Sequence, residues 1–458
     1  MSVLKNILSH IYKYSSLYFF AFLIIFTIDR HHRYEISSNP KAYGPFELDV
    51  AEYYSFLPTF FYQNSDSVSI NFKENKRTIG MAIMYSPSFF GGHTIATFTG
   101  EIKNGYSEPY KWSIRWGSII YLILGLLFCR KSLLLFFDDI IVSISLICVL
   151  FGTNLFFYTY CYGEMPHSYL FFLYSALIYL TLQFVNKQKH QSLIWIGLIS
   201  GLITLIRPTD VVILLFPLAY KVHSVSDIKK RLQSFTKHYF ILALSLLLFT
   251  LPILFQLFIW KKYIGNYIYY SYTDEKFFFN DPQILNFLFS YQKGWLLYTP
   301  IMVFSIIGIV LLRKHLKDFF VPLILITSCS IYILSCWFDW AFGGSFGCRP
   351  IVQLYALLIF PFALFISKTW NLFKNHTVRN MVSRVIIASV LFTLIQFNLF
   401  QIMQARCMQI HWSGMNEKIY KYVFLNSNIT EEELKYLHSI ATPLDYVKLK
   451  KGERGLPL

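Results

Sequence analysis

Residues 239–260 read YFILALSLLLFTLPILFQLFIW, a stretch that contains no charged side chain. At about 1.5 Å per helical residue, a run of this length spans the roughly 30 Å hydrocarbon core of a bilayer. Inside that core each peptide group must find its hydrogen-bond partner within its own segment. The stretch is therefore predicted to form a transmembrane helix.

Similar apolar runs recur between Leu17 and Phe400, so the fold class is predicted to be all-α, a polytopic membrane protein with about 11 transmembrane helices. The predicted spans are residues 14–29, 113–129, 139–160, 167–185, 192–206, 210–220, 239–260, 297–312, 319–337, 351–367 and 382–403. The short pair 192–206 and 210–220 is separated by Arg207-Pro208-Thr209-Asp210, a pattern typical of a cavity-lining hairpin.

The composition agrees with a membrane protein, since 55% of the residues are hydrophobic and only 14% are charged. Soluble domains have roughly a quarter of their residues charged. The net charge of +16 does not indicate a nucleic-acid partner, because the basic residues lie in short connections between apolar runs, where they set topology.

The basic connections predict the orientation. If the N-terminus is cytoplasmic, every cytoplasmic connection is rich in Lys and Arg, as the positive-inside rule requires. These connections contain Arg130/Lys131, Lys187/Lys189, Lys221/Lys229/Lys230/Arg231/Lys237, Arg313/Lys314/Lys317 and Lys368/Lys374/Arg379/Arg384. The first apolar run, Leu17 to Ile28, is followed by no small-residue cleavage site and is predicted to be a retained helix.

Two domains follow from this topology. Residues 1–403 form a transmembrane domain with a large first extracytoplasmic loop over about 30–112, and residues 404–458 form an extracytoplasmic tail. Within the loop, residues 51–62 and 81–98 are strongly apolar and aromatic, which indicates juxtamembrane segments in the interface.

The unusual polar residues fall on the extracytoplasmic side. They are Glu47, Asp49 and Glu52, the segment Gly163 to His167, the segment Arg207 to Asp210, the segment Tyr291 to Trp295, and the segment Trp337 to Pro350. Ionisable residues at membrane depth are costly and usually face a cavity or a partner. One common extracytoplasmic site is therefore predicted.

Asp49 is a candidate general base, because a carboxylate near an apolar wall can be tuned to take a proton from an acceptor hydroxyl or amine. The competing interpretation is an interfacial carboxylate that pairs with a lysine or caps the helix starting near Ala51. Glu52 shares a helical face with Asp49 and is the second candidate base.

Arg207 and Arg349 each precede a proline at the outer end of a predicted span. A guanidinium binds phosphate through two parallel hydrogen bonds, so these two residues are candidates for holding a phosphate leaving group, with Lys293 adding a point charge. The alternative is that each arginine only extends to the membrane interface.

Glu164 and His167 have the spacing of metal ligands on one helical face, but zinc sites need three or four protein ligands. A hydrogen-bonded pair at a helix start is the favoured interpretation. No metal-ligand set is predicted, and participation of a divalent cation is left open. Both residues are candidate substrate-binding residues, as is Trp340, which could stack on a sugar ring or belong to an ordinary aromatic belt.

The chain resembles the GT-C glycosyltransferases, in particular bacterial members of the protein-mannosyltransferase and aminoarabinose-transferase group. The resemblance covers roughly residues 45 to 425, and its motifs are Asp49-x-x-Glu52-Tyr53-Tyr54-Ser55-Phe56-Leu57-Pro58, Thr204-Leu205-Ile206-Arg207-Pro208-Thr209, Tyr291-Gln292-Lys293-Gly294-Trp295-x-x-Tyr298-Thr299-Pro300 and Gly343-Gly344-Ser345-Phe346-Gly347-x-Arg349-Pro350.

This resemblance implies a polyprenyl-phosphate-linked sugar donor, a lipid, glycan or protein acceptor, and a site on the outer face of the bacterial inner membrane. By position it gives Asp49 the role of base or acceptor-positioning residue, and it adds Tyr54 to the candidate substrate-binding residues. Two departures concern the acceptor: Arg77-Thr78-Ile79-Gly80 lacks the proline that the broader family tends to have before the glycine, and Asp49 has no adjacent second acid.

Two other functions remain open at this point. A lipid or polysaccharide transporter or flippase would use the same cavity but would need functional polar residues on both sides of the membrane. A non-catalytic membrane subunit would leave the Arg-Pro boundaries as topology markers only.

Overall fold

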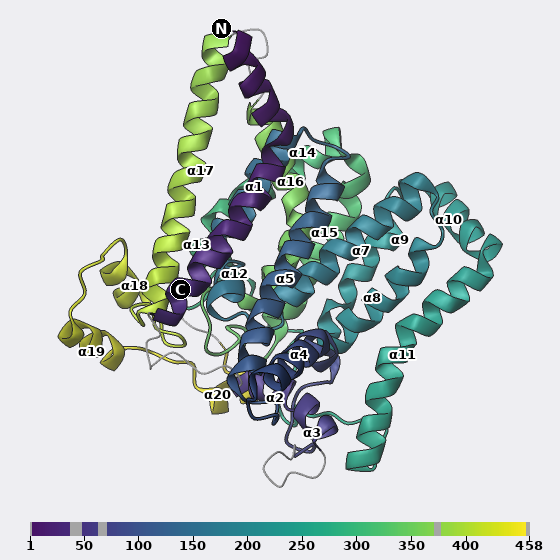
Figure 1. Cartoon of the computed structure of the whole chain (residues 1–458), viewed down its shortest axis with the longest axis vertical. Helices are drawn as coiled ribbons and strands as arrows, with labels where there is room; N and C mark the ends of the chain where they lie inside the picture. The colour runs from purple at the N-terminus through teal and green to yellow at the C-terminus, as the bar shows by residue number, and fades with distance from the viewer. Residues whose placement is uncertain (1, 37–47, 63–70, 371–376, 455–458) are drawn as a thin grey trace.

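The computed structural model describes residues 2–36, 48–62, 71–370 and 377–454, and these residues form a helical protein without any strand (Figure 1). The sole β-type contact among them is an isolated bridge between Phe277 and Trp337. The all-α prediction is confirmed. Glu47 of the predicted site lies outside the described residues.

Seven helical segments of the described chain are long and apolar enough to cross a membrane. They lie in α1 (Ser2–Ile36), α5 (Glu108–Leu133), α7 (His167–Lys187), α11 (Tyr239–Ile264), α15 (Lys317–Cys336), α16 (Tyr355–Trp370, preceded by the 3-10 helix η4, Arg349–Leu354) and α17 (Thr377–Arg406). Shorter apolar helices are α6 (Asp139–Phe151), α8 (Ser192–Ile206), and the 3-10 helix η2 (Pro208–Leu214) with α9 (Leu215–Ala219). The polytopic architecture is confirmed, and the count of eleven stays a prediction.

Several predicted spans are shorter in the structure. The span 139–160 is interrupted, because α6 ends at Phe151 and a separate π-helical turn η1 follows at Phe157–Cys161. The span 297–312 is divided among α13 (Trp295–Tyr298), the 3-10 turn η3 (Pro300–Met302) and α14 (Val303–His315). Pro300 fits the break, since proline lacks a backbone N–H and is tolerated at the start of a helix.

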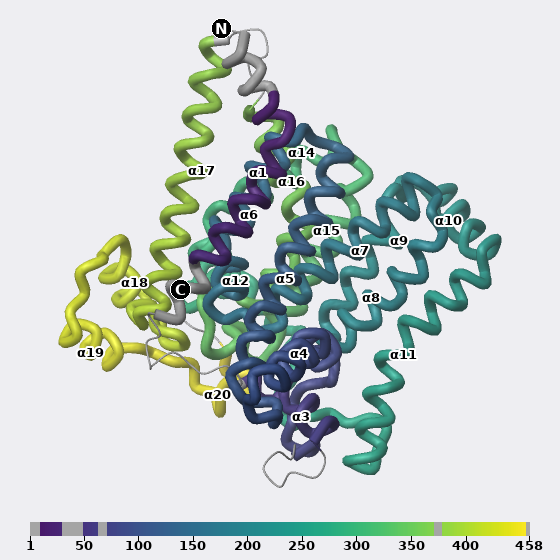
Figure 2. Tube along the Cα trace, viewed as in Figure 1, coloured from purple at the N-terminus to yellow at the C-terminus, as the bar shows by residue number. Residues whose placement is uncertain are grey.

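Helices α7 and α16 form the centre of the bundle, and α11 and α17 lie at its periphery (Figure 2). Most of the apolar window in α7 and α16 is buried, whereas α11 exposes large side chains such as Leu246, Leu251 and Phe255. A helix that is apolar all round and exposed is stable in lipid but not in water. The peripheral helices therefore face lipid.

The first loop folds into helices that pack on the end of the bundle. These are α2 (Leu48–Tyr54), α3 (Phe56–Phe61) and α4 (Gly80–Thr99). A side chain at Gly92 would come within 2.8 Å of the Tyr110 backbone, so a glycine is needed where α4 crosses the start of α5.

The tail also folds onto this end of the bundle, through α18 (Glu417–Val423), α19 (Glu431–Ser439) and α20 (Tyr446–Lys451). Arg454, 1% exposed, donates hydrogen bonds to the carbonyl oxygens of Phe338, Ser335, Trp337 and Asp281. The described part of the tail is thus fastened to the loop after α15. The remaining short helices are α10 (Val225–Lys237) and α12 (Ile284–Phe289).

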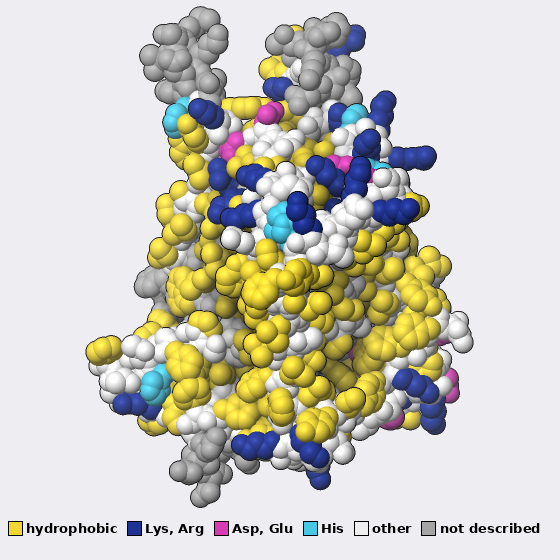
Figure 3. Space-filling view, turned by 90° about the vertical axis from the view of Figure 1, so that its right-hand side faces the viewer, with side chains coloured by type: hydrophobic (Ala, Val, Ile, Leu, Met, Phe, Trp, Pro, Cys, Tyr) yellow, Lys and Arg dark blue, Asp and Glu magenta, His cyan; other side chains and the backbone are white. Residues whose placement is uncertain are grey.

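The side-chain distribution follows the same axis. Figure 3 shows a belt of hydrophobic side chains, with Lys and Arg atoms gathered above the belt and a smaller number below it. This arrangement is the one expected of a membrane protein with basic connections concentrated on one side.

A buried polar cluster joins the N-terminal helix to the bundle. One Asp139 oxygen accepts from Ser15 Oγ at 3.1 Å and from the Ser16 backbone N–H at 2.7 Å. The other accepts from Ser16 Oγ at 2.5 Å and from Arg130 at 3.4 Å. Because α1 otherwise exposes much of its apolar surface, these bonds set its position along α6.

We expect Asp139→Asn to lower the free energy of unfolding by roughly 2–4 kcal/mol, because Arg130 and the serine donors lose a buried charged partner. The measurement is thermal unfolding of the purified protein in detergent. Asp138→Asn, at the exposed neighbouring position, is the matched control and should shift the midpoint little. Equal shifts for the two variants would contradict the prediction.

Candidate active site

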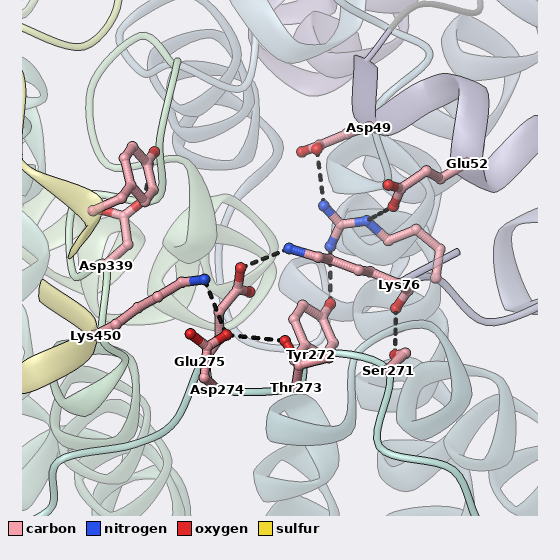
Figure 4. A network of polar contacts seen from close by, with 12 residues as sticks. Asp49, Glu52, Lys76, Ser271, Tyr272, Thr273, Asp274, Glu275, Asp339 and Lys450 are labelled. Carbon is pink, nitrogen blue, oxygen red and sulfur yellow. Dashed lines mark hydrogen bonds and ion pairs between the residues drawn. The ribbon is translucent and has the colours of Figure 1, made fainter. Parts of the chain in front are cut away.

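Helix α2 presents two carboxylates to one arginine. Asp49 and Glu52 lie three residues apart on α2, and both side chains point toward the segment that carries Lys76 (Figure 4). Arg77 approaches Asp49 at 2.9 Å and Glu52 at 3.2 Å. The two acids thus lie on one face of α2, as the sequence predicts, and they share one cationic partner.

A second arginine, far from Asp49 in the sequence, also contacts this carboxylate. Arg349 Nη2 lies 3.3 Å from Asp49 Oδ2, while Arg77 Nη2 contacts Asp49 Oδ1. The Asp49 side chain remains 30% exposed, against 18% for Arg77 and 14% for Arg349. Asp49 therefore bridges two guanidinium groups at a place that solvent still reaches.

The segment before α4 holds Arg77 in place. Asn75 Oδ1 accepts from the Arg77 backbone N–H, and Asn75 Nδ2 donates to the carbonyl of Glu52. The Arg77 guanidinium lies 5.2 Å from the Tyr53 ring centroid and donates to the Tyr272 hydroxyl at 2.9 Å. Such cation–π contacts and hydrogen bonds orient the guanidinium toward α2.

The segment 271–275, after α11, completes the outer edge of the site. Lys76 pairs with Glu275 at 2.6 Å, and Lys450 of α20 pairs with Asp274 at 3.0 Å (Figure 4). The network therefore joins the first loop, the segment after α11 and the tail. Arg77 and these partners were not predicted as site residues, although the sequence stretch Arg77 to Gly80 stood out as a departure from the family pattern.

The charges act differently on the two carboxyl groups of α2. Burial favours a raised pKa for Asp49, but the charges of Arg349 and Arg77 outweigh it and lower the pKa below its ordinary value. Burial raises the pKa of Glu52, and Arg77 only partly offsets that effect. Asp49 is thus held as the anion, whereas Glu52 takes up a proton more readily.

A third carboxylate, Asp339, lies near Arg349, and both border Gly343. Its side chain is 5% exposed, one oxygen accepts from the Tyr446 hydroxyl at 3.2 Å, and the other has no hydrogen-bond partner among the described residues. Burial raises the pKa of Asp339 and the Arg349 charge opposes the rise.

Gly343 separates these groups. Its φ of +63° is in the left-handed region that favours glycine, and a side chain there would lie 3.2 Å from the Tyr446 hydroxyl, 3.7 Å from Asp339 and 3.9 Å from Arg349. The absence of a side chain at Gly343 thus leaves room for the Tyr446 hydroxyl of the tail beside Asp339.

Lys293 does not face the carboxylates. The residue is 2% exposed, and its ammonium donates to the carbonyl oxygens of Ser345 and Trp412. Burial, with the nearby charge of Arg349, lowers the pKa of Lys293 to about 7. The ammonium thus joins the glycine-rich stretch to the tail, and the phosphate-binding role of Lys293 stays a prediction.

Arg207 lies beside the second arginine. Its Nη1 donates to the Pro350 carbonyl at 3.3 Å, directly after Arg349, and it forms no ion pair with any acid in the described ranges. Its neighbour Asp210 accepts instead from Gln353 at 2.9 Å. Arg207 thus lies next to the segment that carries Arg349, and Arg77 is a third guanidinium at this end of the bundle. Their joint role in phosphate binding stays a prediction.

Glu164 and His167 do not pair with each other, which corrects the expected hydrogen-bonded pair. Glu164 binds Arg115 Nε at 3.0 Å, and His167 is fully buried with its ring 4.5 Å from the Tyr158 ring. Across the described part of the chain, no group of three or more His, Cys, Asp or Glu residues is placed to hold a metal ion.

Tyr54 and Trp340 are buried, so neither ring is open to a sugar in this structure. The Tyr54 hydroxyl donates to the Gly105 carbonyl, and its ring packs among Tyr85, Phe89 and Tyr106. Trp340, 1% exposed, donates from Nε1 to the Arg454 carbonyl at 3.2 Å. Both side chains therefore belong to the packed interior of the protein.

The comparison with known proteins gives one family. Residues 107–255 match the family described as dolichyl-phosphate-mannose-protein mannosyltransferase. The matched region runs from the start of α5 into α11 and includes Glu164, His167 and Arg207. No curated protein matches the chain. Over residues 107–255 the chain is similar to the dolichyl-phosphate-mannose-protein mannosyltransferases, which confirms the GT-C resemblance and supports a membrane glycosyltransferase of that type.

Proposed function

We propose that the protein transfers a sugar from a polyprenyl-phosphate carrier to a lipid, glycan or protein acceptor on the extracytoplasmic face of the bacterial inner membrane. The observation that carries the proposal is the Asp49 carboxylate held between Arg77 and Arg349, at one end of the bundle. The site thus contains an anion that can take a proton and cations that can hold a phosphate.

The proposed reaction uses the anion to accept a proton and the cations to hold the phosphate. The acceptor oxygen, or nitrogen for an amine acceptor, attacks the anomeric carbon of the sugar, and its proton passes to Asp49. The bond between that carbon and the phosphate oxygen breaks, and its electron pair leaves with the polyprenyl phosphate. Arg77 and Arg349 bind the phosphate oxygens and stabilise the charge that develops on them.

The ion pairs explain how one carboxylate can be both ionised and reactive. In the structure, Arg77 and Arg349 bind Asp49 itself, and this lowers its basicity. A phosphate that enters between the arginines competes for the same hydrogen-bond donors. Asp49 then loses part of its stabilisation as the anion and becomes a stronger base when the donor is bound.

Arg207 is the third phosphate-binding residue of the proposal, since it lies beside Pro350 and has no acidic partner in the described residues. Lys293 is omitted, because backbone carbonyls already satisfy its ammonium. Asp339, which accepts from the Tyr446 hydroxyl, adds a second negative charge near Arg349.

Activity measurements on two variants distinguish between the two candidate bases. Asp49→Asn should lower kcat by about 10²–10⁴-fold, the usual contribution of a positioned general base, whereas Glu52→Gln should retain most of the activity. The assay uses the purified protein in detergent with polyprenyl-phosphate sugars and measures sugar transfer. Unchanged transfer in both variants would remove both residues as bases.

The second prediction concerns the guanidinium groups. Arg77→Lys and Arg349→Lys keep the charge but lose the paired donors, so KM for the donor should rise roughly 10-fold or more, as expected for hydrogen bonds to a charged group. KM for the acceptor should change little. Arg313→Lys, on an exposed position of α14, is the control. A rise in acceptor KM alone would contradict the assignment.

The third prediction is a pH dependence. Transfer needs ionised Asp49, so the rate falls as the pH drops through the pKa of this group. In the free enzyme the arginines lower that pKa, and donor binding should raise it. The acidic limb of kcat should therefore lie at a higher pH than that of kcat/KM for the donor.

Glu52→Gln should keep this separation of the two limbs, because the variant leaves Asp49 and its arginines intact. Coincident limbs in the wild-type protein would show that donor binding does not displace the arginines.

A further inference from the structure

The amphipathic helix α10 lies far from the candidate active site. It immediately precedes α11, which starts at Tyr239 and is about 39 Å long at 1.5 Å per residue. At the other end of α11, Tyr263 stacks on Phe72 at 4.0 Å, close to α3. Figure 1 places α10 and α3 accordingly at opposite ends of α11.

One side of α10 is fastened to the protein. Arg231 donates to the carbonyl oxygens of Pro217 at 2.9 Å and Tyr220 at 2.8 Å. Phe235 stacks on Phe184 with ring planes 6° apart. These contacts fix the rotation of the helix about its own axis.

A second side of α10 is apolar and has no cover among the described residues. Val225, Ile228 and Leu232 are 69%, 47% and 56% exposed, and their spacing places them on one helical face. The aromatic residues Tyr239 and Phe240 that follow are each 73% exposed. Exposed aromatics beside an apolar edge are typical of the membrane interface.

The third side of α10 is basic. Lys229, Lys230 and Lys237 are exposed. Lys229 borders the apolar side, four residues after Val225, and Lys230 and Lys237 lie farther round the helix at about 100° per residue. The nearby acids are fewer than the basic residues: Asp227 accepts from Ser224 Oγ at 2.9 Å, and Asp318 lies 2.7 Å from His223. The lysine side therefore keeps a net positive charge.

We propose that α10 lies in the bilayer interface on the side opposite the candidate active site and binds anionic phospholipid headgroups. Val225, Ile228 and Leu232 insert among the acyl chains, while Lys229, Lys230 and Lys237 contact the headgroup phosphates. The apolar side of the helix matches the acyl-chain region of a membrane, and its basic side matches the layer of anionic headgroups.

The test uses the full chain reconstituted in vesicles of phosphatidylcholine, with or without phosphatidylglycerol. Hydrogen exchange of the backbone amides in residues 225–237 is compared with that in α7. In the wild-type protein, phosphatidylglycerol should slow exchange in α10 roughly 10-fold or more, since each lysine near an anionic surface strengthens binding to it. High salt should reduce the difference.

The triple variant Lys229→Gln, Lys230→Gln, Lys237→Gln should lose the effect of phosphatidylglycerol but keep the protection seen in phosphatidylcholine. Its control is Lys418→Gln, Lys421→Gln, Lys435→Gln, which removes the same charge from exposed positions in the tail. This control should respond to phosphatidylglycerol as the wild-type protein does.

Ile228→Ser with Leu232→Ser should lose protection in both lipids. Equal exchange in the two lipids, or an unchanged lysine variant, would overturn headgroup binding. Fast exchange of wild-type α10 in both lipids would place the helix outside the membrane and indicate an acidic protein partner instead.

Discussion

The peptide group's need for a hydrogen bond in hydrocarbon is the constraint on which the rest of this structure depends. An apolar run such as 239–260 can satisfy that need only within its own helix. In lipid there is no hydrophobic driving force between helices, so van der Waals packing must stabilise their association. Gly197 and Gly201 allow such packing, because they let α8 approach the backbone of α11 closely. Charged side chains are left to the two ends of the bundle, where water or a partner can stabilise them.

At one of those ends, three segments far apart in the chain meet around Asp49. The first loop contributes the carboxylate and Arg77, the start of η4 contributes Arg349, and the tail contributes Tyr446 beside Asp339. Each arginine offsets the cost of partly burying a carboxylate, and the carboxylates do the same for the arginines. The same balance makes the cluster responsive, because an incoming phosphate changes the partners of all these groups together.

The sequence led to some of these residues and not to others for identifiable reasons. Asp49, Arg207 and Arg349 follow recognisable boundaries between apolar and polar sequence, and they lie near one another. Arg77 was missed because a basic residue in a long loop carries no local sign of its partner. Lys293 was expected to add a point charge beside the two arginines, whereas in the structure it is buried and its ammonium contacts the Trp412 carbonyl of the tail. Glu164 forms an ion pair with Arg115 of α5, and the residue spacing within 163–167 gives no indication of that contact.

The sequence by itself determined that the chain is helical, that it belongs in a membrane and that its unusual polar residues gather at helix ends, because hydrophobicity over a span-length window is a local property. Only the tertiary structure decided which charges pair, that Tyr54 and Trp340 face inward, and that Tyr446 of the tail reaches Asp339. Those outcomes depend on contacts between segments remote in sequence, where one side chain's burial is set by another segment's packing.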